Sequence, residues 1–155
     1  MTAGTIHRVR ELEVRYKALR LPLPVTGQAS NPREAVRLAA AVLDDLHIEK
    51  FIALHFNIKR RLIGVHVVSV GCLDSALAHP REIFTCAFLA SAASLVVAHN
   101  HPSGDPSPSP DDVALTRRLS EAGRVLGVAL DDALIIGDNG RYTRSAKRGC
   151  SDGPC

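Results

Sequence analysis

The chain has 155 residues, of which 46% are hydrophobic and 4% aromatic, and its net charge is +3. This length fits one domain, and the hydrophobic content excludes an intrinsically disordered chain. So few aromatic rings argue against a protein that binds nucleic acid by stacking bases. The four cysteines lack the spacing of a disulfide framework, the N-terminus lacks the apolar core of a signal peptide, and no apolar run reaches the roughly 18 residues that span a bilayer. We therefore expect a cytoplasmic protein without a membrane segment.

The first third of the chain predicts a strand, a linker and a helix. Residues 8–16 alternate apolar and charged side chains, as a half-buried strand does. The Leu-Pro-Leu-Pro sequence at 21–24 excludes a helix interior and indicates an extended linker. Asn31 and Pro32 are typical of a helix start, and apolar residues recur at helical spacing from there to about residue 46.

The middle of the chain predicts a hairpin, a second helix and a buried strand. Two apolar runs, 51–56 and 62–70, flank a polar, basic turn, which favours an antiparallel hairpin. His79 and Pro80 are expected to open the second helix. The short apolar run 95–98 indicates a buried strand that ends at two histidines.

The last third predicts a stiff loop, a third helix and a final strand. Residues 102–110 contain four prolines and three serines and must form a loop. The third helix begins around Ser109 and ends at Gly127, and a strand follows over 128–136. Because strands and helices alternate after the hairpin, we expect an α/β fold in which helices flank a mixed β-sheet.

Three residues in and after the stiff loop carry the chemistry. His99 and His101 are separated by one residue at a strand end, so their rings point to the same side. Asp112 follows eleven residues later. Two imidazoles and a carboxylate are three protein ligands, which together with a water make a catalytic zinc site. Two other interpretations stay open: His99 could be an ordinary core histidine, and Ser109 with Asp112 fits a helix capping box.

The same residues resemble the JAMM (JAB/MPN) metalloprotease signature, which reads His-x-His, seven residues, Ser, two residues, Asp. His99, His101, Ser109 and Asp112 match it without a gap. The resemblance implies that the two histidines and Asp112 bind one Zn²⁺ per chain. It also implies that Ser109 helps to stabilise the tetrahedral intermediate by donating to the developing oxyanion.

Three further segments narrow the resemblance to the RadC-like branch of that superfamily. They are His-Asn-His-Pro-Ser-Gly at 99–104, His-Pro-Arg-Glu-Ile at 79–83 and Asp-Ala-Leu-Ile-Ile-Gly at 132–137. The resemblance covers roughly residues 30–140 and implies the three-layer α/β fold of MPN and cytidine-deaminase-like domains.

We accordingly divide the chain into three parts. An N-terminal strand and linker occupy 1–29, the RadC-like MPN domain occupies 30–140, and a flexible C-terminal tail occupies 141–155. The first 30 residues carry no Gly-hairpin signature. We therefore expect a single-domain form without the helix-hairpin-helix region of longer RadC proteins.

The resemblance also implies a glutamate that acts as general base. Glu49, just before the first strand of the hairpin, occupies the matching place. Glu82 is the rival carboxylate, but it lies at a helix start, where an acidic residue favours the helix dipole without any catalytic role. Asp111 could replace Asp112 on composition alone, but the spacing of the signature selects Asp112. RadC-like proteins usually have Asp-His where this chain has Asp-Ala133, a departure that bears on substrate handling and activity.

Three functions follow. The first is a zinc-dependent metallopeptidase or isopeptidase that attacks an amide bond of a protein or peptide substrate. The second is a DNA-repair or anti-restriction accessory protein, in which the basic segments 7–20 and 59–61 contact phosphates. The third is a catalytically silent MPN interaction module. The sequence leaves the oligomeric state and the scissile bond open.

Overall fold

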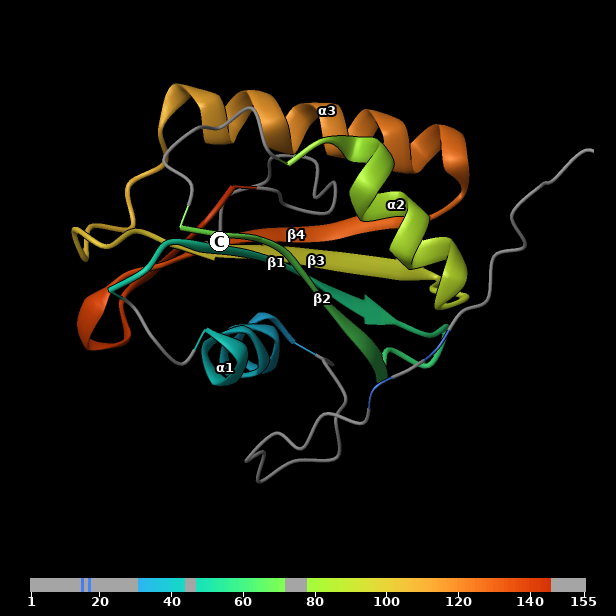
Figure 1. The fold of residues 1–155 in the computed structure, drawn as a ribbon, viewed down its shortest axis with the longest axis horizontal. Helices are drawn as coiled ribbons and strands as arrows, with labels where there is room; N and C mark the ends of the chain where they lie inside the picture. Colours follow the sequence, from blue (N-terminus) through green and yellow to red (C-terminus); the bar gives the residue numbers. More distant parts are fainter. Residues whose placement is uncertain (1–14, 16, 18–30, 44–46, 72–77, 146–155) are drawn as a thin grey trace, which may run out of the picture.

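In the computed structural model, a mixed five-stranded sheet lies between two layers of helices (Figure 1). The structure describes residues 15, 17, 31–43, 47–71 and 78–145. Helix α1 (Pro32–Val42) covers one face of the sheet, whereas α2 (Pro80–Leu89) and α3 (Pro110–Leu126) cover the other face. This arrangement confirms the predicted α/β fold, with helices on both faces of a mixed sheet.

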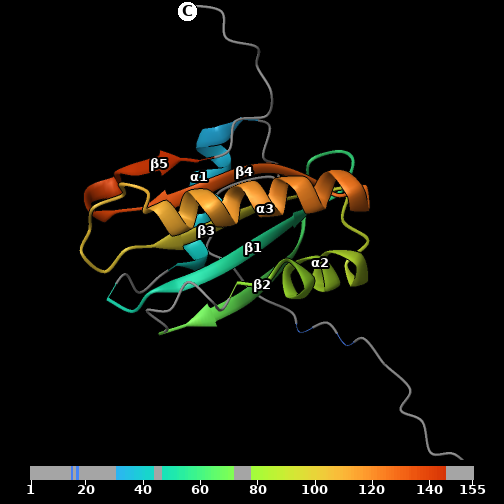
Figure 2. The ribbon, with the colours of Figure 1, turned by 90° about the horizontal axis from the view of Figure 1, so that it is seen from above.

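The strands follow the spatial order β2-β1-β3-β4-β5. Their bounds are β1 (Lys50–Phe56), β2 (Leu62–Val70), β3 (Ser94–Asn100), β4 (Ala129–Ile136) and β5 (Tyr142–Arg144). The predicted hairpin is confirmed, because β1 and β2 pair antiparallel. Strands β3 and β4 pair in parallel, and the parallel connection needs a crossover, which α3 supplies on the α2 side of the sheet (Figure 2).

Alternation along the strands divides the core into two apolar layers. Ile52, Leu54 and Phe56 of β1 face α1 and pack with Leu38 and its neighbours. The residue between the first two, Ala53, faces α2 and α3. The layer on that second face also contains Ile83, Phe84, Ala87, Leu95, Val97, Leu119 and Ala133.

The helix starts follow the sequence closely, and one helix end does not. Asn31 caps α1 by accepting a hydrogen bond from the Glu34 amide at 3.1 Å, and Pro32 is the first helical residue. The helix ends at Val42 and not near residue 46 as expected. Leu43 leaves helical geometry, with φ −86° and ψ 52°, and buries its side chain in the core.

The predicted tail contains a strand at its start. Tyr142–Arg144 form β5, which pairs antiparallel with the end of β4. Arg144 also forms an ion pair with the buried carboxylate of Asp132. Ordered structure therefore continues past residue 140, where we expected a flexible tail. The predicted strand at 8–16 and linker at 21–24 lie outside the described residues, apart from Arg15.

Within the part of the chain that the structure describes, none of the helices is long and apolar enough to cross a bilayer.

Candidate metal centre

Strand β3 delivers the two histidines to one edge of the sheet. His99 is the penultimate residue of the strand and is paired on both sides, with Phe51 of β1 and with Ile135 of β4. Its ring stacks on Phe51, with 5.7 Å between ring centroids and 11° between ring planes. His101 lies just beyond the strand, and its amide donates to the carbonyl of Ile136 at 3.3 Å. The strand is longer than the predicted 95–98 because it has a partner on each side.

Helix α3 delivers Asp112 through its N-terminal cap. The Ser109 hydroxyl accepts a hydrogen bond from the Asp112 amide at 3.1 Å. In return, Oδ2 of Asp112 accepts from the Ser109 amide at 2.8 Å and from the Ser109 hydroxyl at 2.7 Å. The capping-box interpretation of these residues is therefore confirmed. It coexists with the ligand interpretation, because the cap occupies Oδ2 and leaves Oδ1 facing His99.

The three side chains converge on one point. Nε2 of His99 and Nε2 of His101 are 3.0 Å apart. Oδ1 of Asp112 lies 3.2 Å from Nε2 of His99, and Oδ2 lies 3.5 Å from Nε2 of His101. One ligand atom from each of the three residues lies within 4.8 Å of the others, and no other such group occurs among the described residues. His99 is the most buried member, with 8% of its side chain exposed, against 18% for Asp112 and 21% for His101.

A backbone carbonyl sets the tautomer of His101. Nδ1 of this ring lies 2.8 Å from the carbonyl oxygen of Asp105. A carbonyl oxygen can only accept, so Nδ1 carries a proton, and in the neutral ring the lone pair of Nε2 then lies on the side of His99 and Asp112. Histidines that bind metals typically donate their other ring N–H to such an acceptor.

The loop that carries Asp105 is held by the turn after β4. The carbonyl oxygen of Gly104 accepts from the amide of Asp138 at 3.1 Å and from the guanidinium of Arg141 at 3.0 Å, and Arg141 also pairs with the Asp138 carboxylate. Gly104 has φ +76°, and a Cβ there would meet the Asp138 carboxylate at 2.7 Å. Glycine is therefore required at this close approach.

The surroundings of Asp112 keep its carboxylate ionised. Burial alone would raise the pKa of Asp112, but hydrogen bonds from His99 and Ser109 outweigh burial and hold this pKa well below its usual range. An ionised carboxylate is the form that binds a cation.

Two imidazoles and one ionised carboxylate suit zinc better than Mg²⁺ or Ca²⁺, which prefer oxygen ligands. Three protein ligands also leave a fourth tetrahedral position for a water or a substrate oxygen. His99, His101 and Asp112 therefore fit a zinc ion, since Asp105 already holds Nδ1 of His101 and Ser109 already holds Oδ2 of Asp112.

Glu49 lies immediately before β1, the strand that pairs with β3. Its carbonyl oxygen accepts from the amide of Gly71 at 2.8 Å, at the end of β2. Phe51, two residues further on, pairs with His99. Because side chains two residues apart in an extended chain point to the same face, Glu49 is expected on the His99 face. Glu82 is exposed in the first turn of α2, where a helix-dipole role explains it.

Sequence reasoning missed Asn100, the residue between the two histidines. Asn100 is fully buried, at 0% exposure. Its side chain bonds to the backbone on both sides of Glu49, at Ile48 and Lys50. The available signal was a polar residue at the end of a fully buried strand, where a carboxamide must find partners.

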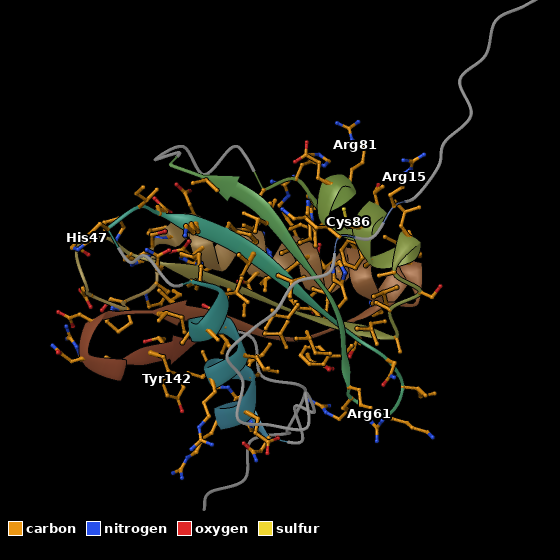
Figure 3. All side chains as sticks on the ribbon, turned by 60° about the horizontal axis from the view of Figure 1, so that its bottom comes forward. Arg15, His47, Arg61, Arg81, Cys86 and Tyr142 are labelled. Atoms are coloured by element: carbon orange, nitrogen blue, oxygen red, sulfur yellow. The ribbon has the colours of Figure 1, made fainter. Side chains whose placement is uncertain are left out.

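The structure describes part of each of the two basic segments noted in the sequence. Arg15 and Arg61, one from each segment, lie at well-separated points of the surface (Figure 3). In the hairpin turn, the guanidinium of Arg60 lies 3.5 Å from the buried carboxylate of Asp131. Arg60 therefore has an ion-pair partner within the protein.

Comparisons with known proteins show which family the chain belongs to. The model of the RadC-like JAB domain matches residues 29–150. The chain belongs to the RadC-like JAB domain family.

The curated relatives of this RadC-like domain are called "UPF0758 protein". The relative from Moorella thermoacetica is 48% identical over 118 residues, which are 76% of this chain and 51% of that protein. The relative from Desulforudis audaxviator is 50% identical over 108 residues, 70% of this chain and 47% of that protein. The relative from Methanosarcina acetivorans is 44% identical over 112 residues, 72% of this chain and 48% of that protein. The chain thus spans about half the length of these relatives.

Ala133, the position where the sequence resemblance leads us to expect histidine, is close to the candidate ligands. It is buried on β4 opposite Val97 and lines a small pocket that also touches His99 and Asp112. Thr116 and Ser145 are the polar residues of the pocket wall besides these two ligands. The departure therefore changes the pocket beside the ligands and leaves the three ligands themselves in place.

Proposed function

We propose that the protein is a zinc-dependent hydrolase of the metallopeptidase or isopeptidase type. The observation that supports this proposal is the convergence of His99, His101 and Asp112 within 4.8 Å of one another. The hydrogen bonds of His101 with Asp105 and of Asp112 with Ser109 strengthen it, because they orient one ring nitrogen and one carboxylate oxygen toward the same point. The substrate class is an amide of a protein or peptide.

The metal would be held by the two histidine Nε2 atoms and by Asp112. When bound, zinc acts as a Lewis acid that lowers the pKa of a coordinated water to about 7 and polarises a carbonyl oxygen. The protein contributes the orientation of the ligands. His99 is fixed by stacking on Phe51, His101 by the carbonyl of Asp105, and Asp112 by the cap of α3.

Glu49 is the proposed general base. Its carboxylate takes a proton from the attacking water and delivers that proton to the nitrogen of the leaving amine. This role requires a group beside the ligands that is not itself a ligand. Glu49 is not one of the candidate ligands, since the ligand group among the described residues contains only the two histidines and Asp112.

Ser109 is the proposed oxyanion donor. In the structure its hydroxyl donates to Asp112 Oδ2. Donation to the oxygen of a tetrahedral intermediate therefore requires the hydroxyl to turn away from Asp112 as negative charge develops on the substrate. The helix cap keeps Ser109 beside Asp112 in either orientation of the hydroxyl.

The test has two stages. Elemental mass spectrometry compares the protein purified without chelator with the His99→Ala/His101→Ala double variant, and we expect about one zinc per chain that is lost in the variant. The zinc-loaded protein is then screened against libraries of peptide and isopeptide substrates. Glu49→Gln should lower the rate of amide hydrolysis by about 100-fold or more while it keeps the zinc.

The matched control is Glu82→Gln, which removes the rival carboxylate and should leave both zinc content and hydrolysis unchanged. If Glu82→Gln lost hydrolysis and Glu49→Gln kept it, Glu82 and not Glu49 would be the general base. The proposed hydrolase activity would be refuted if the zinc-loaded wild type hydrolysed no amide faster than the His99→Ala/His101→Ala variant does. An interaction module would then be the better description.

A further inference from the structure

Asn100 lies between the two candidate ligands on β3, yet its side chain serves a different segment. We infer that Asn100 is the positioning residue for Glu49, so that three successive residues at the end of β3, 99–101, supply two metal ligands and position the general base. The inference rests on the proposed function, because it assigns Glu49 that role.

The carboxamide of Asn100 brackets Glu49. Its Oδ1 accepts from the amide of Lys50 at 2.9 Å, and its Nδ2 donates to the carbonyl oxygen of Ile48 at 3.0 Å. These are the backbone groups on either side of Glu49. The carboxamide of Asn100 satisfies both bonds in only one orientation, because the Lys50 amide needs the acceptor Oδ1 and the Ile48 carbonyl needs the donor Nδ2.

These two hydrogen bonds of Asn100 lie where the pairing between β1 and β3 ends. The ladder between β1 and β3 ends at Phe51 and His99. One residue further, the side chain of Asn100 replaces the backbone bonds that a continued ladder would make. On the other side, the amide of Gly71 bonds to the carbonyl oxygen of Glu49. The backbone of Glu49 is therefore tied to β3 through Asn100 and to the end of β2 through Gly71.

This geometry couples the distance between base and ligands to the side chain of Asn100. The histidines move with the backbone of β3, and the Asn100 bonds oblige the segment around Glu49 to move with them. A displacement of about 1 Å between reacting groups can lower a rate by about 100-fold. An apolar side chain of the same size would fill the volume at position 100 but would leave Ile48 and Lys50 without these bonds.

The test compares Asn100→Leu, which removes both bonds, with Asn100→Asp, which keeps an acceptor for the Lys50 amide. The matched control is Asn57→Leu. Asn57 lies at the other end of β1, and its Oδ1 likewise accepts two backbone amides, from Lys59 and Arg61. Asn57→Leu thus removes the same kind of contact far from the histidines.

Three measurements separate positioning from a merely structural role. Zinc content should stay at about one per chain in Asn100→Leu, because the ligands are intact. In the absence of zinc, hydrogen exchange of the Lys50 amide should be at least about tenfold faster in Asn100→Leu than in the wild type. The ¹³C resonance of the Glu49 carboxyl group, identified by its loss in Glu49→Gln, should shift when zinc is added to the wild type and not when zinc is added to Asn100→Leu.

In kinetics, Asn100→Leu should lower kcat by about 100-fold with little change in KM, Asn100→Asp should lower it less, and Asn57→Leu should not lower it. In the Glu49→Gln background the substitution at position 100 should have no further effect, since it acts through Glu49. If Asn100→Leu keeps the zinc response of Glu49 and the kcat of the wild type, the positioning role is refuted. If Glu49 of the wild type fails to respond to zinc, its role as base is refuted, and the inference falls with the proposed function.

Discussion

Two histidine pairs lie on the same face of the sheet, and only one of them resembles a metal site. His99 and His101 meet Asp112 at the end of β3. His55 and His66 come from β1 and β2, where the register sets His66 opposite Ala53 and His55 opposite Leu95. Those two partners belong to the core that α2 and α3 cover.

The two pairs differ in the partners of their ring nitrogens. Nδ1 of His101 is held by a backbone carbonyl, and both rings of the first pair approach a carboxylate. In the second pair, Nε2 of His55 and Nδ1 of His66 are buried without a hydrogen-bond partner. Burial, followed by the neighbouring His66, lowers the pKa of His55 to about 4, and burial also lowers the pKa of His66. Two adjacent imidazoles are thus not sufficient. The charge of Glu82 also acts on His66, where it raises the pKa against the larger effect of burial. At the candidate site, by contrast, a carboxylate lies within 3.5 Å of both rings and a backbone carbonyl holds one of them.

The largest expected effect is the difference in zinc affinity between a variant that lacks the first histidine pair and a variant that lacks the second. His99→Ala/His101→Ala should weaken zinc binding by more than about 100-fold, because two of three ligands are lost. His55→Leu/His66→Leu should change the zinc affinity less than threefold. Titration of each apoprotein with zinc against a competing chelator measures both values. Equal losses of affinity in the two double variants would contradict the distinction drawn between the pairs.

The second expected effect is the contribution of His55 to the pH dependence of the free energy of unfolding. The pKa of this residue is about 4 in the folded protein, against about 6.5 in the unfolded chain. Between these values the unfolded chain binds the proton and the folded protein does not. The contribution of His55 to the free energy of unfolding is therefore fully present above pH 6.5 and falls by about 3 kcal/mol as the pH is lowered to 4.

Urea denaturation of the apoprotein at pH 7, 5.5 and 4 measures this loss. His55→Leu should lose less stability over the same range than the wild type does, by about 3 kcal/mol. His47→Gln is the control, because His47 is exposed (Figure 3), and it should keep the wild-type pH dependence. An unchanged pH dependence in His55→Leu would show that His55 is not the group that titrates.

The sequence predicted the local features of the site, because they depend on neighbours in the chain. The apolar run before His99, the proline-rich loop and the cap at Ser109 are all local signals, and each lies where it was expected. Asn100 was missed because its partners are the backbone groups of residues 50 and 52 positions away. Such contacts exist only once β1 and β3 are paired.

The two differences in the fold have similar causes. Strand β5 is three residues long, too short for a periodic pattern, and it forms because the end of β4 offers it a partner. Helix α1 ends early although apolar spacing continues, because Leu43 is buried from a non-helical conformation. In both places tertiary packing decides what local propensity leaves undetermined.

The smallest expected effect separates the two roles of the Ser109–Asp112 pair. Ser109→Ala removes the cap acceptor and the hydroxyl that donates to Asp112, so we expect a loss of about 1 kcal/mol of apoprotein stability. Zinc affinity should fall by about tenfold, since the hydroxyl supports a ligand without being one. Asp112→Ala should lose more zinc affinity than Ser109→Ala, because it removes the ligand itself. Ser109→Thr keeps a hydroxyl and should restore most of both quantities. Urea denaturation and zinc titration of the three variants measure these losses. If Ser109→Ala weakened zinc binding as much as Asp112→Ala does, Ser109 would be acting as a ligand and not as the support of one.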